Sequence, residues 1–255
     1  MVSEREHVGD FNGDGFLDRI TFASNGDFLV QKRIPWSSFE TNQWVWGRNG
    51  SDLPDKRRYR IADVNGDGRS DVISFEANGG IYVWISTGNN NFQGPLKWGS
   101  NGADIGALRY KIGDFNGDRR ADIVYFESNK NFYIWLAQPG GGFQGPFQWG
   151  SNGADYGTID IYRVADVNGD NRSDIVSIEG ARFFVWKSFG NAFGTPAQWG
   201  SNGAVLGTYR YQLGNAGAGI LSDVISFESN GGKYIWNSNG TNQFVLWSGN
   251  WFLDW

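Results

Sequence analysis

The sequence contains no cysteine, one histidine (His7) and one methionine among its 255 residues. Without cysteine, the chain has no disulfide, no thiol nucleophile and no thiolate ligand for zinc. With a single imidazole, it also cannot build a metal site from several histidines. These absences exclude most of the chemistries that hydrolases use.

Long apolar runs and excess positive charge are also absent. No stretch approaches the roughly 18 apolar residues that a membrane helix needs, and the opening segment MVSEREHVGD has no apolar signal-peptide core. The formal net charge is −5, which provides no basic field for nucleic acid or anionic lipid. We therefore expect a soluble chain without a Sec-type signal, membrane insertion or a nucleic-acid partner.

Glycine and aromatic residues are abundant. There are 38 glycines, about twice the usual share of roughly 7%, and aromatic residues make up 16% of the chain, with 13 tryptophans. This combination is typical of many tight turns between short, aromatic-rich strands.

The chain is built from an internal repeat. Segments such as ADVNGDGRSDVISF from Ala62 and ADVNGDNRSDIVSI from Ala165 align without gaps, and related copies begin at Gly9, Gly113 and Gly214. The spacings between the loop starts at 10, 63, 114, 166 and 215 are 53, 51, 52 and 49 residues. Periods of this length indicate propellers or solenoids.

Each repeat predicts four short strands. In the second copy they are RYRIAD, DVISFE, IYVWIS and PLKWGSNG, rich in β-branched and aromatic residues and separated by turn residues. No segment shows sustained helical periodicity, so we expect an all-β chain. Four such strands cannot bury both faces alone, so the units must stack, and five of them predict one five-bladed β-propeller of four-stranded antiparallel blades over residues 1–255.

The chain order suggests how the ring would close. Arg5–Asp10 would supply the first strand of the first unit, and Trp247 would lie in the last strand of the fifth. We therefore expect closure by packing of the first blade against the last, helped by residues 251–255, without exchange of a strand.

An acidic loop separates the first two predicted strands of four repeats, with the pattern D-x-N-x-D-x-x-x-D. Alternate side-chain oxygens and a carbonyl from the seventh residue form the hard oxygen set that calcium prefers, and the glycine after the asparagine permits a tight turn. We predict four structural Ca²⁺ sites with saturated ligand sets. Their ligands are Asp10, Asn12, Asp14, Phe16 and Asp18; Asp63, Asn65, Asp67, Arg69 and Asp71; Asp114, Asn116, Asp118, Arg120 and Asp122; Asp166, Asn168, Asp170, Arg172 and Asp174.

The fifth loop, from Asn215 to Asp223, has no carboxylate at its first, third or fifth position and should not bind calcium. The alternative for the intact loops is that their side chains cap backbone amides within Asp/Asn-rich turns. Calcium is favoured because three carboxylates within nine residues repel one another without a cation.

A second pattern, Trp-Gly-Ser/Arg-Asn-Gly, ends four of the repeats and often precedes an Asp and then an Arg that opens the next repeat. An aromatic face with an amide, a carboxylate and a guanidinium suits a sugar, so we predict ligand sites between adjacent blades. The alternatives are packing for the tryptophans and salt bridges for the arginines, and the recurring Glu76, Glu127, Glu179 and Glu228 are left unassigned. The predicted set is Trp46, Asn49, Asp52 and Arg58; Trp98, Asn101, Asp104 and Arg109; Trp149, Asn152 and Asp155; Trp199, Asn202 and Arg210.

The repeated DVNGDGRSDVISF segment resembles the FG-GAP/VCBS propeller repeat, and the fuller unit is similar to propeller lectins of the Psathyrella velutina type. The resemblance implies calcium in the blade loops and sites for N-acetylglucosamine or related sugars between blades. Those lectins have six or seven blades, whereas this chain has five units.

We therefore expect a calcium-stabilised, multivalent carbohydrate-binding lectin without catalysis, acting on glycoconjugates. The alternatives are an integrin-like adhesion propeller and, third, a glycoside hydrolase or polysaccharide lyase. The calcium loops suit extracellular calcium, so we expect action outside the cell, with cytoplasmic storage or non-classical export left open.

Overall fold

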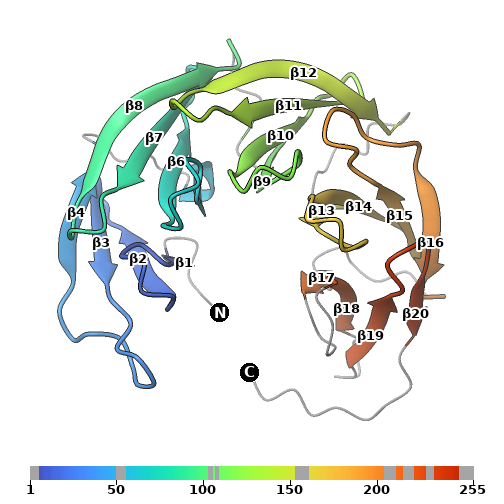
Figure 1. Ribbon diagram of the computed structural model, residues 1–255, viewed down its shortest axis with the longest axis horizontal. Coiled ribbons are helices and arrows are strands. Elements are labelled where there is room, and N and C mark those ends of the chain that lie inside the picture. Colours follow the sequence, from blue (N-terminus) through green and yellow to red (C-terminus); the bar gives the residue numbers. More distant parts are fainter. Residues whose placement is uncertain are drawn as a thin grey trace. The chain divides into compact units, whose positions relative to one another are not determined.

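The computed structural model describes residues 6–49, 56–102, 106, 109–152, 161–203, 211–214, 221–227 and 233–246. Within these ranges the chain forms five antiparallel sheets of four strands, each in chain order, and a short 3-10 helix, Lys56–Arg58 (Figure 1). The strands are β1 (Glu6–Gly9), β2 (Asp18–Phe22), β3 (Asp27–Gln31) and β4 (Trp44–Arg48) in sheet 1; β5 (Tyr59–Ala62), β6 (Asp71–Phe75), β7 (Gly80–Ser86) and β8 (Phe92–Ser100) in sheet 2; β9 (Tyr110–Gly113), β10 (Asp122–Phe126), β11 (Asn131–Ala137) and β12 (Phe143–Ser151) in sheet 3; β13 (Tyr162–Ala165), β14 (Asp174–Glu179), β15 (Arg182–Trp186) and β16 (Ala197–Ser201) in sheet 4; β17 (Tyr211–Gly214), β18 (Asp223–Phe227), β19 (Lys233–Ser238) and β20 (Phe244–Leu246) in sheet 5.

The predicted all-β class and the four antiparallel strands of each repeat are confirmed. The contacts divide the chain into two compact units. The first holds Met1–Ile112, Asp118–Glu127 and Tyr133–Phe147, and the second holds the rest, so sheet 3 contributes to both. The closed five-bladed ring stays a prediction, and Trp247 and residues 251–255 lie outside the described residues.

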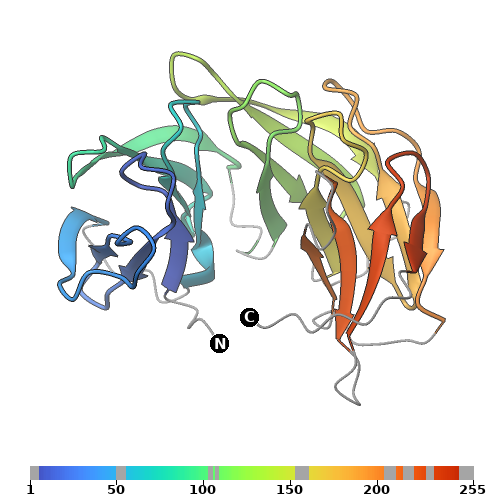
Figure 2. The ribbon, with the colours of Figure 1, turned by 60° about the horizontal axis from the view of Figure 1, so that its bottom comes forward.

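In sheets 2 and 3, the second strand is buried along its whole length. All five residues of β6 and of β10 are buried, because side chains on both faces of these strands are covered. Strands buried on both faces need mostly apolar residues, which DVISF and DIVYF provide after their first aspartate, with the small side chain of Ser74 buried among them. Figure 2 shows these strands between their neighbours from a second direction.

Aromatic side chains join neighbouring sheets within each unit. Between sheets 1 and 2, the ring of Phe28 meets the indole of Trp84 edge-on at 5.0 Å, and the Trp84 Nε1–H donates to the carbonyl of Arg48 at 3.1 Å. Trp186 repeats both contacts between sheets 3 and 4, with Phe132 and the carbonyl of Ser151. The prediction that the mid-strand tryptophans Trp84, Trp135, Trp186 and Trp236 serve packing agrees with their exposures of 1%, 1%, 1% and 5%.

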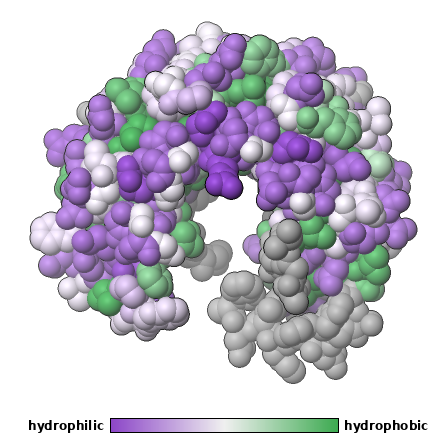
Figure 3. Space-filling view, viewed as in Figure 1, coloured by the Kyte–Doolittle hydropathy of each residue, from purple (hydrophilic) through white to green (hydrophobic). Residues whose placement is uncertain are grey.

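Most large apolar side chains are thus buried, although some, such as Trp36, are exposed. Hydrophilic residues cover most of the face seen in Figure 3. Among the described residues, the structure contains no helix long and apolar enough to cross a membrane.

Candidate functional site

Each acidic loop is closed by its own carboxylates. In the first loop, Asp10 Oδ1 accepts the N–H of Gly13 at 2.8 Å, and Oδ2 accepts that of Gly15 at 2.8 Å. Asp63 makes the same bonds to Gly66 at 2.7 Å and Gly68 at 2.8 Å. The predicted tight turn is confirmed, since the glycines after the asparagines have φ of +78° to +82°, which glycine adopts without steric cost.

Successive loops are also linked by main-chain hydrogen bonds. The carbonyl of Asp10 accepts the N–H of Ser70 at 2.6 Å, and the carbonyl of Asp63 accepts that of Ala121 at 2.7 Å. In the second unit, Asp114 accepts from Ser173 in the same way. The loops therefore stabilise the contact between sheets as well as the turn within each sheet.

The ninth residue of each intact loop is a fully buried aspartate. Asp71 Oδ2 accepts the N–H of Val64 at 3.1 Å, and Oδ1 accepts that of Ser86 at 2.8 Å. Burial raises the pKa of Asp71 to about 7, against the lowering effect of these two donors, and the charges of Asp67 and Asp63 raise it further. The same causes raise the pKa of Asp174 to about 7 and that of Asp18 to about 6.

The seventh loop residue has a role that the sequence did not reveal. In the second loop, the guanidinium of Arg69 pairs with Asp67 at 2.5 Å, and its Nε–H donates to the carbonyl of Ser86 at 3.1 Å. Arg120 with Asp118 and Arg172 with Asp170 repeat the ion pair. These loops thus carry an internal cation beside the carboxylates, in addition to the carbonyl expected as a calcium ligand.

The first loop differs at this position. It has Phe16, whose ring contacts Trp36 edge-on at 5.5 Å, so no guanidinium from the loop's own seventh residue neutralises Asp14. Asp14 Oδ2 accepts from the side-chain amide of Asn12 at 2.9 Å, as Asp67 Oδ2 does from Asn65 at 3.0 Å. The first loop therefore lacks the internal guanidinium that the next three loops have.

The chemistry of the donor set fits calcium, since carboxylate and amide oxygens of four side chains gather within nine residues. Carboxylate oxygens have enough lone pairs to accept an N–H and still face an ion. Within the described ranges, no group of three or more acidic or histidine side chains is arranged to hold a metal ion. The calcium sites stay a prediction.

The second candidate site lies where two neighbouring sheets meet, and we call this boundary a seam. At the seam of sheets 1 and 2, the side-chain amide of Asn49 donates to the hydroxyl of Tyr59 at 2.7 Å and to Glu76 Oε1 at 3.5 Å. Glu76 Oε1 also accepts from the hydroxyl of Ser74 at 2.7 Å. Asn49 directly follows β4, Tyr59 opens β5, and Glu76 directly follows β6.

The same cluster recurs in the second unit. Asn152 donates to the hydroxyl of Tyr162 at 2.6 Å and to Glu179 at 3.2 Å, and Ser177 donates to Glu179 at 2.6 Å. Between sheets 4 and 5, Asn202 donates to the hydroxyl of Tyr211 at 3.1 Å. We call these groups the seam clusters.

The seam clusters are partly withdrawn from water. Burial raises the pKa of Tyr59 to about 12, against the lowering effect of the bond from Asn49, and the charge of Glu76 adds to the rise. The phenol is therefore protonated at neutral pH and able to donate. In the clusters of Asn49 and Asn152, the asparagine amide donates to both a tyrosine hydroxyl and a glutamate carboxylate.

The predicted arginines lie beside the seams and bind main-chain oxygens. Arg58 Nη1–H donates to the carbonyl of Phe75 at 3.0 Å, and Arg109 Nη1–H donates to that of Phe126 at 2.9 Å. Each arginine therefore reaches the second strand of its own sheet, one residue before the recurring glutamate.

Three of the four tryptophans predicted to contact ligand are buried. Trp46, Trp149 and Trp199 are 1%, 7% and 3% exposed and pack against phenylalanines of the following sheet. Trp98 is the one of the four that keeps exposed surface, packing on Phe143 at 5.4 Å. In this conformation only Trp98 offers an indole face, and the other three act in packing.

The structure brings together part of the predicted ligand set. Asn49, Asn152 and Asn202 join the seam clusters, whereas Asp52, Asp104, Asp155 and Arg210 lie outside the described residues. The predicted set omitted the tyrosines and glutamates. The signal for them is present in the sequence, because Tyr and Glu recur at fixed positions in the repeats.

A comparison with models of protein families identifies the type of repeat. Residues 63–125 and 114–177 match the FG-GAP-like repeat. The chain carries FG-GAP-like repeats. A comparison with curated protein sequences finds no match.

Solved structures with a similar fold include two lectins. One is an Agrocybe aegerita lectin that recognises non-reducing terminal N-acetylglucosamine, with a TM-score of 0.79 and 22% identity over 95% of this chain and 65% of that one. The other is the BP39L lectin of Burkholderia pseudomallei, with a TM-score of 0.63 and 14% identity over 94% of this chain and 69% of that one. A Photorhabdus luminescens Tc holotoxin pore also matches, with a TM-score of 0.67 and 20% identity over 96% of this chain and 12% of that one. At these sequence identities, the similarity of this chain to each structure shows a shared fold and nothing about function.

Proposed function

We propose that the protein is a multivalent lectin that binds carbohydrate at its seams, with N-acetylglucosamine or a related sugar as ligand, in a five-bladed propeller. The observation that carries this proposal is the recurrence of the seam cluster at Asn49 and at Asn152 with the same partners. The similarity to a lectin that recognises terminal N-acetylglucosamine supports the choice of ligand class.

The chemistry of the seam cluster suits a sugar. The asparagine amide and the tyrosine hydroxyl can donate to ring or acetamido oxygens, and the glutamate can accept from sugar hydroxyls. Because the groups are partly desolvated, each such hydrogen bond is stronger than it would be in water. Several weak sites on one chain raise avidity for a branched or clustered glycan.

The protein acts as a binder rather than an enzyme in this proposal. Glycoside hydrolysis needs two carboxylates flanking one scissile bond, in distinct environments. Glu76 and Glu179 instead occupy equivalent places in separate seams, each accepting from a serine and an asparagine. This arrangement supports repeated binding over a single catalytic centre.

Calcium has a structural part in the proposal. Asp10, Asn12, Asp14 and Asp18, with their counterparts in the next three repeats, would hold one ion per loop. A bound ion supplies positive charge that offsets the repulsion among these carboxylates. Because the loops also link neighbouring sheets, this charge would stabilise the seams without entering the sugar sites.

The test is a glycan array with the whole chain, in calcium and in EDTA. We expect binding in calcium, reduced when Asn49 and Asn152 are both changed to Ala, and unchanged by Asn191→Ala in the exposed β15–β16 hairpin. A blank array together with one tight protein partner would favour the adhesion alternative. Release of reducing sugar or of an unsaturated product would favour an enzyme.

A further inference from the structure

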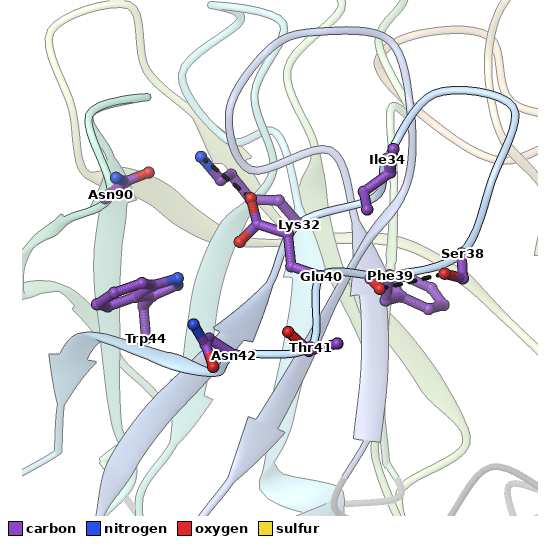
Figure 4. Close-up of a pocket in the computed structure, with 9 residues that line it drawn as sticks. All are labelled: Lys32, Ile34, Ser38, Phe39, Glu40, Thr41, Asn42, Trp44 and Asn90. Atoms are coloured by element: carbon purple, nitrogen blue, oxygen red, sulfur yellow. Dashed lines mark hydrogen bonds and ion pairs between the residues drawn. The ribbon is translucent and has the colours of Figure 1, made fainter.

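Sheet 1 carries a cavity that no seam residue lines. It has a volume of about 440 Å³ and lies beside the segment from β3 to β4 (Figure 4). Small-molecule sites commonly have volumes of roughly 300–1,000 Å³. The lining residues are Lys32, Ile34, Ser38, Phe39, Glu40, Thr41, Asn42, Trp44 and Asn90.

The segment that builds the cavity is ordered by its own backbone. Beyond β3 the chain continues as a hairpin, in which the N–H of Glu40 donates to the carbonyl of Lys32 at 2.9 Å and Arg33 pairs with Phe39. The side-chain amide of Gln31 donates to the carbonyl of Glu40 at 3.0 Å. The lining side chains therefore project from a fixed frame, which lowers the entropic cost of binding.

The cavity has no net charge. Lys32 and Glu40 face each other across the hairpin, with Nζ and Oε1 3.7 Å apart, and each side chain is about one third exposed or less. The other lining side chains are uncharged. An ionic ligand would therefore have to compete with an existing ion pair, whereas a neutral polar ligand can use the donors and acceptors that remain.

An aromatic face completes the lining. Trp44 opens β4 and is 52% exposed, which leaves part of its indole available for stacking. In the view of Figure 4, Asn42 and Asn90 lie on the same side of the ion pair as this indole. Asn90 comes from the β7–β8 turn of sheet 2, where its φ of +58° belongs to a turn closed by a hydrogen bond from Thr87 to Asn91.

We propose that the cavity lined by Lys32, Glu40, Asn42, Trp44 and Asn90 is an additional binding site for a neutral hexopyranose. The C–H face of the sugar stacks on Trp44, and its hydroxyls bond to the amides of Asn42 and Asn90 and to the exposed side of the ion pair. This site takes the ligand class of the proposed lectin but uses none of the seam residues.

The segment differs from its counterparts in the other repeats. The second and third repeats have STGNNNFQGP and AQPGGGFQGP between the third and fourth strands, whereas the first has KRIPWSSFETNQW. The glycine-rich turns carry neither an ion pair nor an exposed tryptophan. The site is therefore expected once per chain, unlike the seam clusters.

The test is native mass spectrometry of the whole chain, titrated with the methyl glycosides of glucose, galactose, mannose and N-acetylglucosamine. We expect Trp44→Ala to weaken one bound sugar at least tenfold. Trp36→Ala, in the same segment and 93% exposed but outside the cavity, is the matched control and should bind as the wild type does. Equal loss in both variants, or no loss in Trp44→Ala, would overturn the proposal.

Two further arms separate this site from the seams and test its charge. In a chain with Asn49, Asn152 and Asn202 changed to Ala, one sugar should still bind, and Trp44→Ala should remove it. Binding lost entirely in the triple variant would overturn the separate site, whereas seam variants without any effect would overturn the seam proposal alone.

Glu40→Gln should raise affinity for methyl glucuronide relative to methyl glucoside, and an unchanged ratio would contradict the neutral, ion-paired lining.

Discussion

Sheets 1 and 2 belong to the same compact unit and have the same arrangement of four antiparallel strands, yet their functional side chains differ. Asp18 and Asp71 occupy the same loop position and accept equivalent main-chain hydrogen bonds. Sheet 2 adds Arg69 beside its loop and Glu76 at its seam, whereas sheet 1 has Phe16 and Ala23 at those positions. Sheet 1 in turn has the cavity beside Trp44.

The comparison separates residues that stabilise the strands and loops from residues that determine what each sheet could bind. Buried positions whose hydrogen bonds close the loop are the same in both sheets, because any change would leave main-chain groups unpaired. Positions at the seam and in the β3–β4 segment differ, because the hydrogen bonds that close the loops do not depend on them. The predictions below test this division, beginning with the largest effect.

Replacing the buried loop aspartate should lower the free energy of unfolding about equally in both sheets. Asp71→Ala leaves the N–H groups of Val64 and Ser86 without their acceptor, which should lower the free energy of unfolding by about 2–5 kcal/mol. Asp18→Ala should do the same through Phe11 and Arg33. Urea unfolding measures both, and a loss confined to one variant would mean that the two sheets do not share a frame.

Calcium should stabilise the chain, and more so through the first loop. At a concentration 100 times its Kd, each site would add about 2.7 kcal/mol. EDTA should therefore lower the Tm, and titration calorimetry should show the tightest site lost in Asp14→Asn, since Phe16 leaves that carboxylate without the guanidinium that Arg69 gives Asp67. An unchanged Tm in EDTA would refute bound calcium, and a larger loss from Asp67→Asn would reverse the comparison.

Arg69→Gln should weaken sheet 2 modestly. It removes the ion pair with Asp67 and the hydrogen bond to the carbonyl of Ser86, which together should contribute about 1 kcal/mol at this partly buried position. Phe16→Leu in sheet 1 is the control for loss of a seventh-residue side chain. The internal-cation role predicts that only Arg69→Gln becomes more sensitive to EDTA, and equal sensitivity would contradict it.

The smallest effect concerns His7, which occupies in β1 the place that Arg60 occupies in β5. Burial lowers the pKa of His7 below 6.5, and the charge of Arg60 lowers it further. The unfolded chain therefore binds a proton first as the pH falls below 6.5, so stability decreases there. The unfolding free energy at pH 5.5 minus that at pH 7.5 should be more positive in His7→Gln than in the wild type, since the buried aspartates contribute equally to both proteins. An equal difference would exclude an effect of His7.

The repeat made most of the fold predictable from sequence. Short runs of β-branched and aromatic residues, such as DVISF and IYVWIS, predicted the strands of each unit, and the Asn-Gly pairs predicted the loop turns. The packing role of Trp84 also followed from its mid-strand position. By contrast, the burial of Trp46 depends on Phe92 from the next repeat, a contact between residues 46 apart that no local pattern encodes.

The site was less predictable, for the same physical reason. Asn49 was identified from a recurring pattern, but its partners Tyr59 and Glu76 come from two other strands, which only the register of β5 on β6 brings together. The cavity beside Trp44 was missed because it belongs to one repeat, and repetition was the signal on which the site prediction relied. Unique segments carry no such signal.

The most direct measurement is the number of N-acetylglucosamine methyl glycoside molecules that one chain binds, counted by native mass spectrometry for the wild type, Asn49→Ala and Asn152→Ala. Binding at the seams predicts at least two bound molecules in the wild type and one fewer in each variant. No binding at millimolar sugar, or the same number in all three proteins, would contradict it.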